Sequence, residues 1–339
     1  MRFLTWLVLG LAVLWGGYWA VGQYGVKRAA GALQENLAAE GVALEWSELD
    51  LRGFPSRFDT TLSAVSLVDP EAGIAWRAPF LQVMALSYRP TSVIAAFSPV
   101  QTIETPLGTA EILSEGLRAS AGIRAALAVP LDHATAEAEW LRVAAETPAG
   151  GWVAEARDVL LAFREAEPGD GGEEESPAAY DIYAAAAPLL LPEPLLAALD
   201  PEGRMPAEVT RLSLDATLGL SGPVAARVDA EPELERVELR RAELVWGEMV
   251  LEGSGAFSIR PDGRPEGRID LTLTDWQTAL DLAIDAGLLS PEIRGTVELA
   301  AGTMEGEDGR LAVPVVFTEG RMGIGPLPAL APAPVLVAR

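Results

Sequence analysis

An uncharged apolar run near the N-terminus, Phe3 to Gly22, constrains this chain more than any other feature of its sequence. A segment of about twenty apolar residues is long enough to cross a bilayer as one helix, which satisfies its backbone hydrogen bonds internally. Charged residues are absent between Arg2 and Lys27, and aromatic residues gather toward the ends of the run, as in spanning helices: Trp6, Trp15, Tyr18, Trp19 and Tyr24. We therefore predict a transmembrane anchor over residues 1–25 and a tethered domain after it.

A cleaved signal peptide is the alternative interpretation of this run, because Ala20, Val21 and Gly22 form an acceptable cleavage site before Gln23. The run is longer than a usual signal core and is preceded by a single arginine, so the sequence favours a retained anchor. Basic residues are nearly balanced at the two ends and do not set the orientation. We expect a single pass through the inner membrane with the bulk of the chain in the periplasm, because short-tailed anchors usually double as export signals.

The composition excludes several classes of function. The 339 residues carry a formal net charge of −24, and such a chain repels the phosphates of nucleic acid. The same charge argues against peripheral docking onto anionic lipid, which leaves the N-terminal helix as the attachment to the bilayer. The chain has no cysteine, so disulfides, thiol catalysis and thiolate metal sites are excluded together. We predict no cofactor and no metal.

After the anchor, the spacing of the apolar residues changes. A stripe at helical intervals predicts a juxtamembrane helix over residues 26–41: Val26, Ala30, Leu33 and Leu37. Beyond it, short segments with alternating apolar residues recur between Gly and Pro turns, which is typical of a meandering antiparallel sheet. We predict a mainly β fold with a few α-helices, in which an extended, curved antiparallel sheet follows the transmembrane helix.

An acidic, glycine-rich segment divides the β-rich part of the chain. Residues 165–177 hold no large apolar side chain and cannot bury enough surface to offset their loss of entropy, so we predict a flexible loop there. Calcium binding by its carboxylates is the less favoured alternative, because the alternating ligand spacing of a calcium loop is missing. The loop would separate a first β-rich half, 42–164, from a second, 178–339. In the second half, residues 276–289 predict an amphipathic helix with Asp275 as its N-cap.

Several short blocks resemble one protein family. The blocks RGFPSRF at 52–58, DPEAGIAW at 69–76, APF at 78–80 and LSYRP at 86–90 are similar to domain-of-unknown-function family 2125, a family of membrane-anchored alphaproteobacterial proteins. The tail LAVPVVFTEGRMGIGPLP at 311–328 resembles the C-terminal block of that family. Residues 244–274 also resemble the AsmA-like envelope proteins, which implies an inner-membrane-anchored β-rich protein associated with lipid transport. Neither resemblance supplies catalytic residues.

The most distinctive block carries the candidate contact residues Arg52, Phe54, Arg57 and Phe58. In one interpretation they contact a lipid headgroup or a partner protein, with the arginines binding phosphate and the phenylalanines entering an apolar groove. In the other, which the glycine and proline of the block favour, they form a tight turn packed by its aromatic rings, and the arginines pair with Asp50 and Asp59.

Catalytic motifs are absent from the sequence. His133 is the only histidine, which excludes multi-histidine metal sites, and its place after Pro130 favours a surface role. The sequence has no phosphate loop, dinucleotide fingerprint, serine elbow or zinc-protease motif. We expect a non-enzymatic envelope protein whose curved sheet offers an apolar groove for acyl chains or a surface for another envelope protein. A protein-only scaffold and a carboxylate-based glycan hydrolase are the alternatives.

Overall fold

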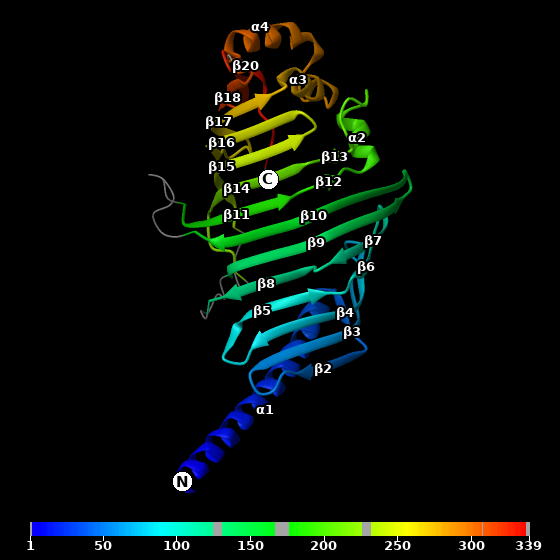
Figure 1. Ribbon diagram of the computed structural model, residues 1–339, viewed down its shortest axis with the longest axis vertical. Helices are drawn as coiled ribbons and strands as arrows, with labels where there is room; N and C mark the ends of the chain where they lie inside the picture. Colours follow the sequence, from blue (N-terminus) through cyan, green and yellow to red (C-terminus); the bar gives the residue numbers. More distant parts are fainter. Residues whose placement is uncertain (1, 125–130, 167–175, 226–231, 307, 337–339) are drawn as a thin grey trace. The chain divides into compact units, whose positions relative to one another are not determined.

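The computed structural model describes residues 2–124, 131–166, 176–225, 232–306 and 308–336. Over these residues, twenty strands pair in antiparallel fashion into one large sheet, accompanied by four α-helices and one short 3-10 helix (Figure 1). The predicted mainly β fold with few helices is confirmed. Most of the acidic segment predicted to be a flexible loop lies outside the described residues, which break off between 166 and 176.

The chain divides into two compact units. Unit 1 comprises residues 1–123 and 141–151, and unit 2 comprises residues 124–140 and 152–339. Two long strands, β9 (Leu131–Thr147) and β10 (Gly150–Glu165), contribute residues to both units. The predicted division into β-rich halves at residues 165–177 stays a prediction.

One continuous helix, α1 (Arg2–Ala39), contains both the predicted anchor and the predicted juxtamembrane helix. Its length and apolar composition suit a membrane span. Half-buried residues recur along it with helical periodicity from residue 16 onward and mark the face that packs on the strands of unit 1: Gly16, Trp19, Gly22, Gln23, Val26, Ala30, Gly31, Gln34 and Leu37. Leu33, predicted on this stripe, is exposed. Gln34 takes the contact position instead, and its Nε2 donates a hydrogen bond to the Leu44 carbonyl at 2.9 Å.

The sheet of unit 1 is built around one long hairpin, the strands β3 and β4. β1 and β2 pair with the free edge of β3, whereas β5 and β6 pair with different parts of the free edge of β4. β8 extends the branch of β5, and β7 extends the branch of β6. The bounds are β1 Ala43–Glu45, β2 Glu48–Arg52, β3 Arg57–Asp69, β4 Ile74–Leu86, β5 Arg89–Phe97, β6 Val100–Thr105, β7 Gly108–Glu115 and β8 Arg118–Ile123.

Unit 2 is an antiparallel meander that runs from β10 through β11, β14, β15, β16, β17, β18 and β19 to β20 (Figure 1). The short strands β12 and β13 pair with each other, and β12 also pairs with β10. The strand bounds are β11 Ala178–Ala186, β12 Leu189–Leu190, β13 Glu208–Val209, β14 Arg211–Leu220, β15 Leu234–Trp246, β16 Met249–Ile259, β17 Pro265–Thr274, β18 Leu311–Thr318, β19 Arg321–Ile324 and β20 Leu327–Pro332. The helices are α2 Glu193–Leu199, α3 Trp276–Asp285, the 3-10 helix η1 Pro291–Ile293 and α4 Arg294–Met304.

The apolar core of unit 2 includes three local clusters, two of which lie under helices. Trp246 and Met249 pack with Leu282 of α3 and with leucines of α2. A second cluster joins Trp276 and Leu280 of α3 to α4 and β18. A third lies around Phe317 of β18. Because these helices are short, they cover the sheet only locally.

The predicted helix at 276–289 exists as α3 but differs at both ends. Asp275 occupies the N-cap position, yet its side chain makes no capping hydrogen bond, because its φ of 49° departs from the extended backbone that aims a capping carboxylate at the first-turn amides. The helix ends at Asp285 and the chain turns at Gly287, whose φ is 72°. The helices η1 and α4, which follow within residues 291–304, were not predicted from the sequence.

One buried carboxylate ties four strands of unit 2 together. Asp181 of β11 accepts hydrogen bonds from Arg164 of β10 at 2.9 and 3.1 Å, from Thr217 of β14 at 2.9 Å and from Arg240 of β15 at 2.6 Å. Burial opposes ionisation, but the hydrogen bonds from Arg240, Thr217 and Arg164 outweigh it and hold the pKa of Asp181 below its usual range. A bulge in β15 makes this contact, since Arg240 is the extra residue between Leu239 and Ala242.

We expect Asp181→Asn to lower the free energy of unfolding at pH 7 by about 2 kcal/mol, because Arg240 and Arg164 lose the anion to which both donate hydrogen bonds. A carboxyl whose pKa is lower in the folded state stabilises the fold above its unfolded pKa of about 4, and this contribution is lost as the pH falls through the folded pKa. The difference between wild type and variant should therefore shrink below about pH 4. Denaturant unfolding of the detergent-solubilised protein at several pH values measures it.

Asp270→Asn is the matched control, because Asp270 pairs with Arg268 on the exposed surface of the same sheet. This substitution should leave the unfolding midpoint nearly unchanged at every pH. An Asp181→Asn loss that is the same at pH 3 and pH 7 would contradict the assigned role of the charge.

Candidate functional site

The predicted block at residues 52–58 forms a tight turn between β2 and β3. The Gly53 carbonyl accepts hydrogen bonds from the Ser56 and Arg57 amides, at 3.2 and 2.9 Å. Gly53 has a φ of 101°, and a Cβ at this position would lie 2.8 Å from the Arg57 carbonyl oxygen. Only glycine suits this conformation and this close approach.

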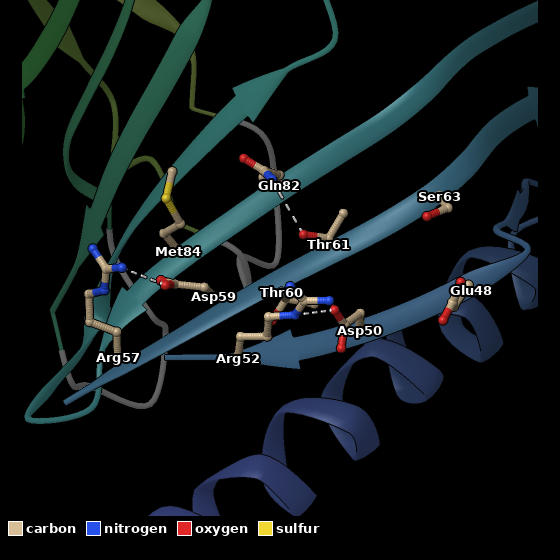
Figure 2. A pocket seen from close by; sticks show the side chains of 10 residues that line it. All are labelled: Glu48, Asp50, Arg52, Arg57, Asp59, Thr60, Thr61, Ser63, Gln82 and Met84. Carbon is tan, nitrogen blue, oxygen red and sulfur yellow. Dashed lines mark hydrogen bonds and ion pairs between the residues drawn. The ribbon is translucent and has the colours of Figure 1, made fainter. Parts of the chain in front are cut away.

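Arg52 and Arg57 lie on a polar face of unit 1, where a pocket of about 620 Å³ opens over β2, β3 and β4 (Figure 2). Arg52 pairs with Asp50 at 2.6 Å, and Arg57 pairs with Asp59 at 2.8 Å. These are the ion pairs expected if the block is a turn. The pocket is lined by Glu48, Asp50, Arg52, Arg57, Asp59, Thr60, Thr61, Ser63, Gln82 and Met84. Its carboxylates outnumber its guanidinium groups, so its charge does not favour a phosphate.

Phe54 and Phe58 do not lie with the arginines but contact the anchor helix. Phe58 is 5% exposed and stacks on Trp19 with the ring centroids 6.1 Å apart, while Phe54 meets the edge of the same indole at 5.4 Å. Phe54 nevertheless remains 61% exposed. The four predicted contact residues are therefore split between the two faces of the turn. Their predicted role in binding a ligand or partner stays a prediction.

The described residues contain a second candidate site, an apolar groove on the sheet of unit 2. Its volume is about 550 Å³. It is lined by Val159, Leu161, Ala184, Ala185, Ala186, Leu212, Ser213, Leu214, Leu239, Ala242, Glu243, Leu244, Leu251, Gly253, Ile269 and Leu271, and we call this set the apolar groove. These residues come from β10, β11, β14, β15, β16 and β17, which are neighbours in the meander.

The strand register explains the shape of the apolar groove. One row of paired residues crosses all six strands: Leu161, Ala184, Leu214, Ala242, Gly253 and Leu271. Half of this row is alanine or glycine. The neighbouring row on one side pairs Leu212, Leu244 and Leu251, whereas Leu239 and Ile269 lie in the row on the other side. Small residues between rows of branched ones leave a hollow in the middle of the sheet face.

The polar residues among the lining belong to the opposite face of the sheet. Ser213 pairs with Ala185 and with Glu243 in a row that alternates with the apolar rows, so these residues present their backbone to the groove. The Glu243 carboxylate pairs with Arg211 at 3.4 Å and Arg241 at 3.3 Å. The groove therefore offers hydrocarbon and almost no hydrogen-bonding group. Leu161 is 51% exposed and Leu212 is 43% exposed, so its wall is open to solvent.

The sequence predicts an apolar groove on a curved sheet but does not identify the residues that line it. The available signal was the alternation of apolar residues in β14, β16 and β17. This period-two pattern shows which residues share a face, but it does not show whether a helix covers that face. The small residues that form the hollow align only through the pairing of six strands, which alternation within one strand does not reveal.

Several carboxylates of the described residues gather around arginine side chains. Asp200, Asp281 and Asp285 all pair with Arg204, and Asp281 also pairs with Arg294. His133 is half exposed and lies 2.9 Å from the Asp132 carboxylate. No group of three or more metal-ligating side chains occurs in the part of the chain that the structure describes. A carboxylic acid that acts as a general acid near neutral pH needs a raised pKa. The pKa of the buried Asp181 is instead lowered, so this group does not suit that role.

A family model described as "Uncharacterized protein conserved in bacteria (DUF2125)" matches residues 19–334. The chain belongs to the DUF2125 family. The matched range contains the turn at 53–57 and every residue of the apolar groove in this DUF2125 protein. No curated protein and no solved structure matches the chain.

The contact between α1 and the turn depends on Gly22. A Cβ at this position would lie 2.2 Å from Cζ of Phe58, whereas a Cβ at Gly25 would meet nothing within 4 Å. We expect Gly22→Leu to separate the helix from the turn and to cost about 1–3 kcal/mol, as overpacking does. Gly25→Leu gains the same helix propensity without the clash, so it should not destabilise the protein. Thermal unfolding in detergent measures both, and equal midpoints for the two variants would contradict the packing.

Proposed function

We propose that this DUF2125 protein is a non-enzymatic, membrane-anchored protein that binds the acyl chain of a lipid in the apolar groove of unit 2. The observation that supports this most strongly is the chemistry of the groove, in which leucine, isoleucine, valine, alanine and glycine supply the side-chain lining. A large uncovered apolar surface is unfavourable in water and marks a binding site. An acyl chain removes this surface from water and has no hydrogen-bonding group of its own. It therefore suits a groove whose side chains offer no hydrogen bond.

The dimensions of the groove support the same ligand. Its volume of about 550 Å³ lies within the usual range for small-molecule sites, about 300–1,000 Å³. The central row crosses six strands, so it extends over about 24 Å at roughly 4.8 Å per strand spacing. One acyl chain occupies about half of the ~30 Å hydrocarbon core of a bilayer. The row is therefore long enough for a single chain.

The anchor supports a lipid ligand rather than a free apolar metabolite. Helix α1 is long and apolar enough to cross a bilayer, and a tether keeps the groove at a high effective concentration of lipid. The predicted location in the periplasm, the inner-membrane anchor and the AsmA-like resemblance belong to this proposal. A protein-only scaffold is the competing function, and it needs no apolar groove.

The predicted orientation of the chain in the membrane can be tested separately. A fusion of alkaline phosphatase to the C-terminus should be active in cells, because this enzyme folds only after export. The matched fusion to a fluorescent protein that folds only in the cytoplasm should be dark. The reverse pair of results would place the bulk of the chain in the cytoplasm and contradict the periplasmic location.

The groove is tested by placing a charge in its wall. Leu161→Glu and Leu212→Glu should weaken binding of a fluorescent fatty acid at least tenfold, because each introduces a carboxylate into a hydrocarbon-lined site. Both side chains are already largely exposed, so the fold should tolerate the change. Fluorescence titration of the purified full-length protein measures affinity, and native mass spectrometry detects lipid that co-purifies with it.

Tyr183→Glu is the matched control, because Tyr183 is 39% exposed on β11 but alternates to the face opposite Ala184. It should bind as wild type does. Absence of fatty-acid binding and of co-purifying lipid in the wild-type protein would contradict the proposed ligand. Equal loss in all three variants would remove the groove as its site.

A further inference from the structure

The anchor helix makes its first contacts with unit 1 inside the apolar run and not beyond it. The Trp15 indole Nε1 donates a hydrogen bond to the Pro55 carbonyl at 2.8 Å, and the Trp19 Nε1 donates to the Arg57 carbonyl at 3.0 Å. The Tyr18 hydroxyl donates to the Ser87 carbonyl. Three successive aromatic residues of the run therefore bind the backbone of two loops, the β2–β3 turn and the β4–β5 turn.

These contacts determine how deep the two loops lie if α1 crosses the bilayer. From Leu4 to Trp15 the helix advances about 16 Å at about 1.5 Å per residue. This is roughly half of the ~30 Å hydrocarbon core, so the span has to continue to about Gly22. The residues that hold the loops then lie within the far half of the membrane rather than above it.

We propose that the β2–β3 turn around Phe54 and the β4–β5 turn around Tyr88 insert into the far leaflet of the bilayer that α1 spans, among its acyl chains and below its headgroups. The occupant of this surface is the lipid of that same leaflet. The inference depends on α1 as a membrane span but not on the ligand of the apolar groove.

The chemistry of the two turns suits this environment. Phe54 and Tyr88 are each 61% exposed, although both are large aromatic residues at the tips of turns. Aromatic rings prefer the membrane interface, where the ring lies among the acyl chains and a hydroxyl can reach the headgroups. The exposed Arg52 has an aliphatic stem and a guanidinium group that can extend to the phosphate level.

The backbone of the turns partly meets a second requirement of a low-dielectric environment, since several of its polar groups are paired within the protein. The Gly53 carbonyl accepts from the Ser56 and Arg57 amides, and the Ser87 amide donates to the Ser56 carbonyl at 2.9 Å. The Pro55 carbonyl accepts from Trp15, and proline has no amide hydrogen to satisfy. Paired polar groups lower the cost of inserting a loop into lipid.

Because the chain has no cysteine, single-cysteine variants report on individual positions. Phe54→Cys and Tyr88→Cys, each labelled with an environment-sensitive fluorophore, are reconstituted as full-length protein in phosphatidylcholine vesicles. Some vesicles contain lipids with a spin label at the headgroup or along the acyl chain. We expect blue-shifted emission at both positions and at least twofold stronger quenching than at the control position.

Leu107→Cys is the matched control in the same unit. Leu107 is 76% exposed in the β6–β7 turn. Strand β6 pairs with the start of β4, whereas Tyr88 follows the end of β4. The 13 residues of β4 place the two ends about 40 Å apart. Val13→Cys, within the apolar run, reports whether α1 is in the bilayer.

Strong quenching at Val13 with equally weak quenching at 54, 88 and 107 would overturn the insertion and leave the anchor intact. Weak quenching at Val13 as well would overturn both the span and the insertion. Circular dichroism shows whether Phe54→Cys unfolds the protein by disturbing the contact with Trp19. If it does, Tyr88→Cys still tests the insertion. Neither outcome bears on fatty-acid binding in the groove, so the two proposals can fail separately.

Discussion

The structure depends on one constraint, which is that each apolar face of an antiparallel sheet has to be covered by something. In unit 1 the helix α1 covers part of the sheet, and its half-buried stripe packs on residues such as Phe58 of β3. In unit 2 the short helices α2, α3 and α4 cover only local clusters around Trp246 and Trp276. The central row of the groove, from Leu161 to Leu271, is not part of these helix-covered clusters. These residues belong to the apolar groove, where the proposed acyl chain would complete the core.

The polar face of the same sheet shows how the groove keeps its shape. The bulge at Arg240 brings a guanidinium group to Asp181 and shifts the register of β15, so Leu239 and Ala242 lie on the same face although three positions separate them. The contact of Arg240 with Asp181 and the position of Leu239 on the apolar face are therefore both consequences of a single extra residue. A change at Asp181 is expected to affect the stability of the strands that form the groove.

Much of the fold follows from the sequence, because the period-two segments and the Gly and Pro turns are local signals. The alternating segments predicted beyond residue 41 correspond to strands such as β3, β9 and β15. The helix α4 was not predicted, and its sequence RGTVELAAGTM has two glycines, two threonines and a valine, which are of low helix propensity, and an indistinct apolar stripe. The end of α3 was placed too late because Gly287 adopts a left-handed conformation that ends the helix.

The sequence by itself determined the apolar run, the absence of cysteine, the excess of acidic residues and the alternation that makes a β-rich chain. It also identified the turn at 52–58, since Gly53 and Pro55 are local conformational signals. Only the tertiary structure decided that Phe58 packs on Trp19 while Arg57 pairs with Asp59 on the other face. It alone aligned Ala184, Ala242 and Gly253 into the floor of a groove. The physical reason is that alternation fixes the face of each residue within its own strand, whereas the register between strands and the cover of a face depend on contacts between residues far apart in sequence.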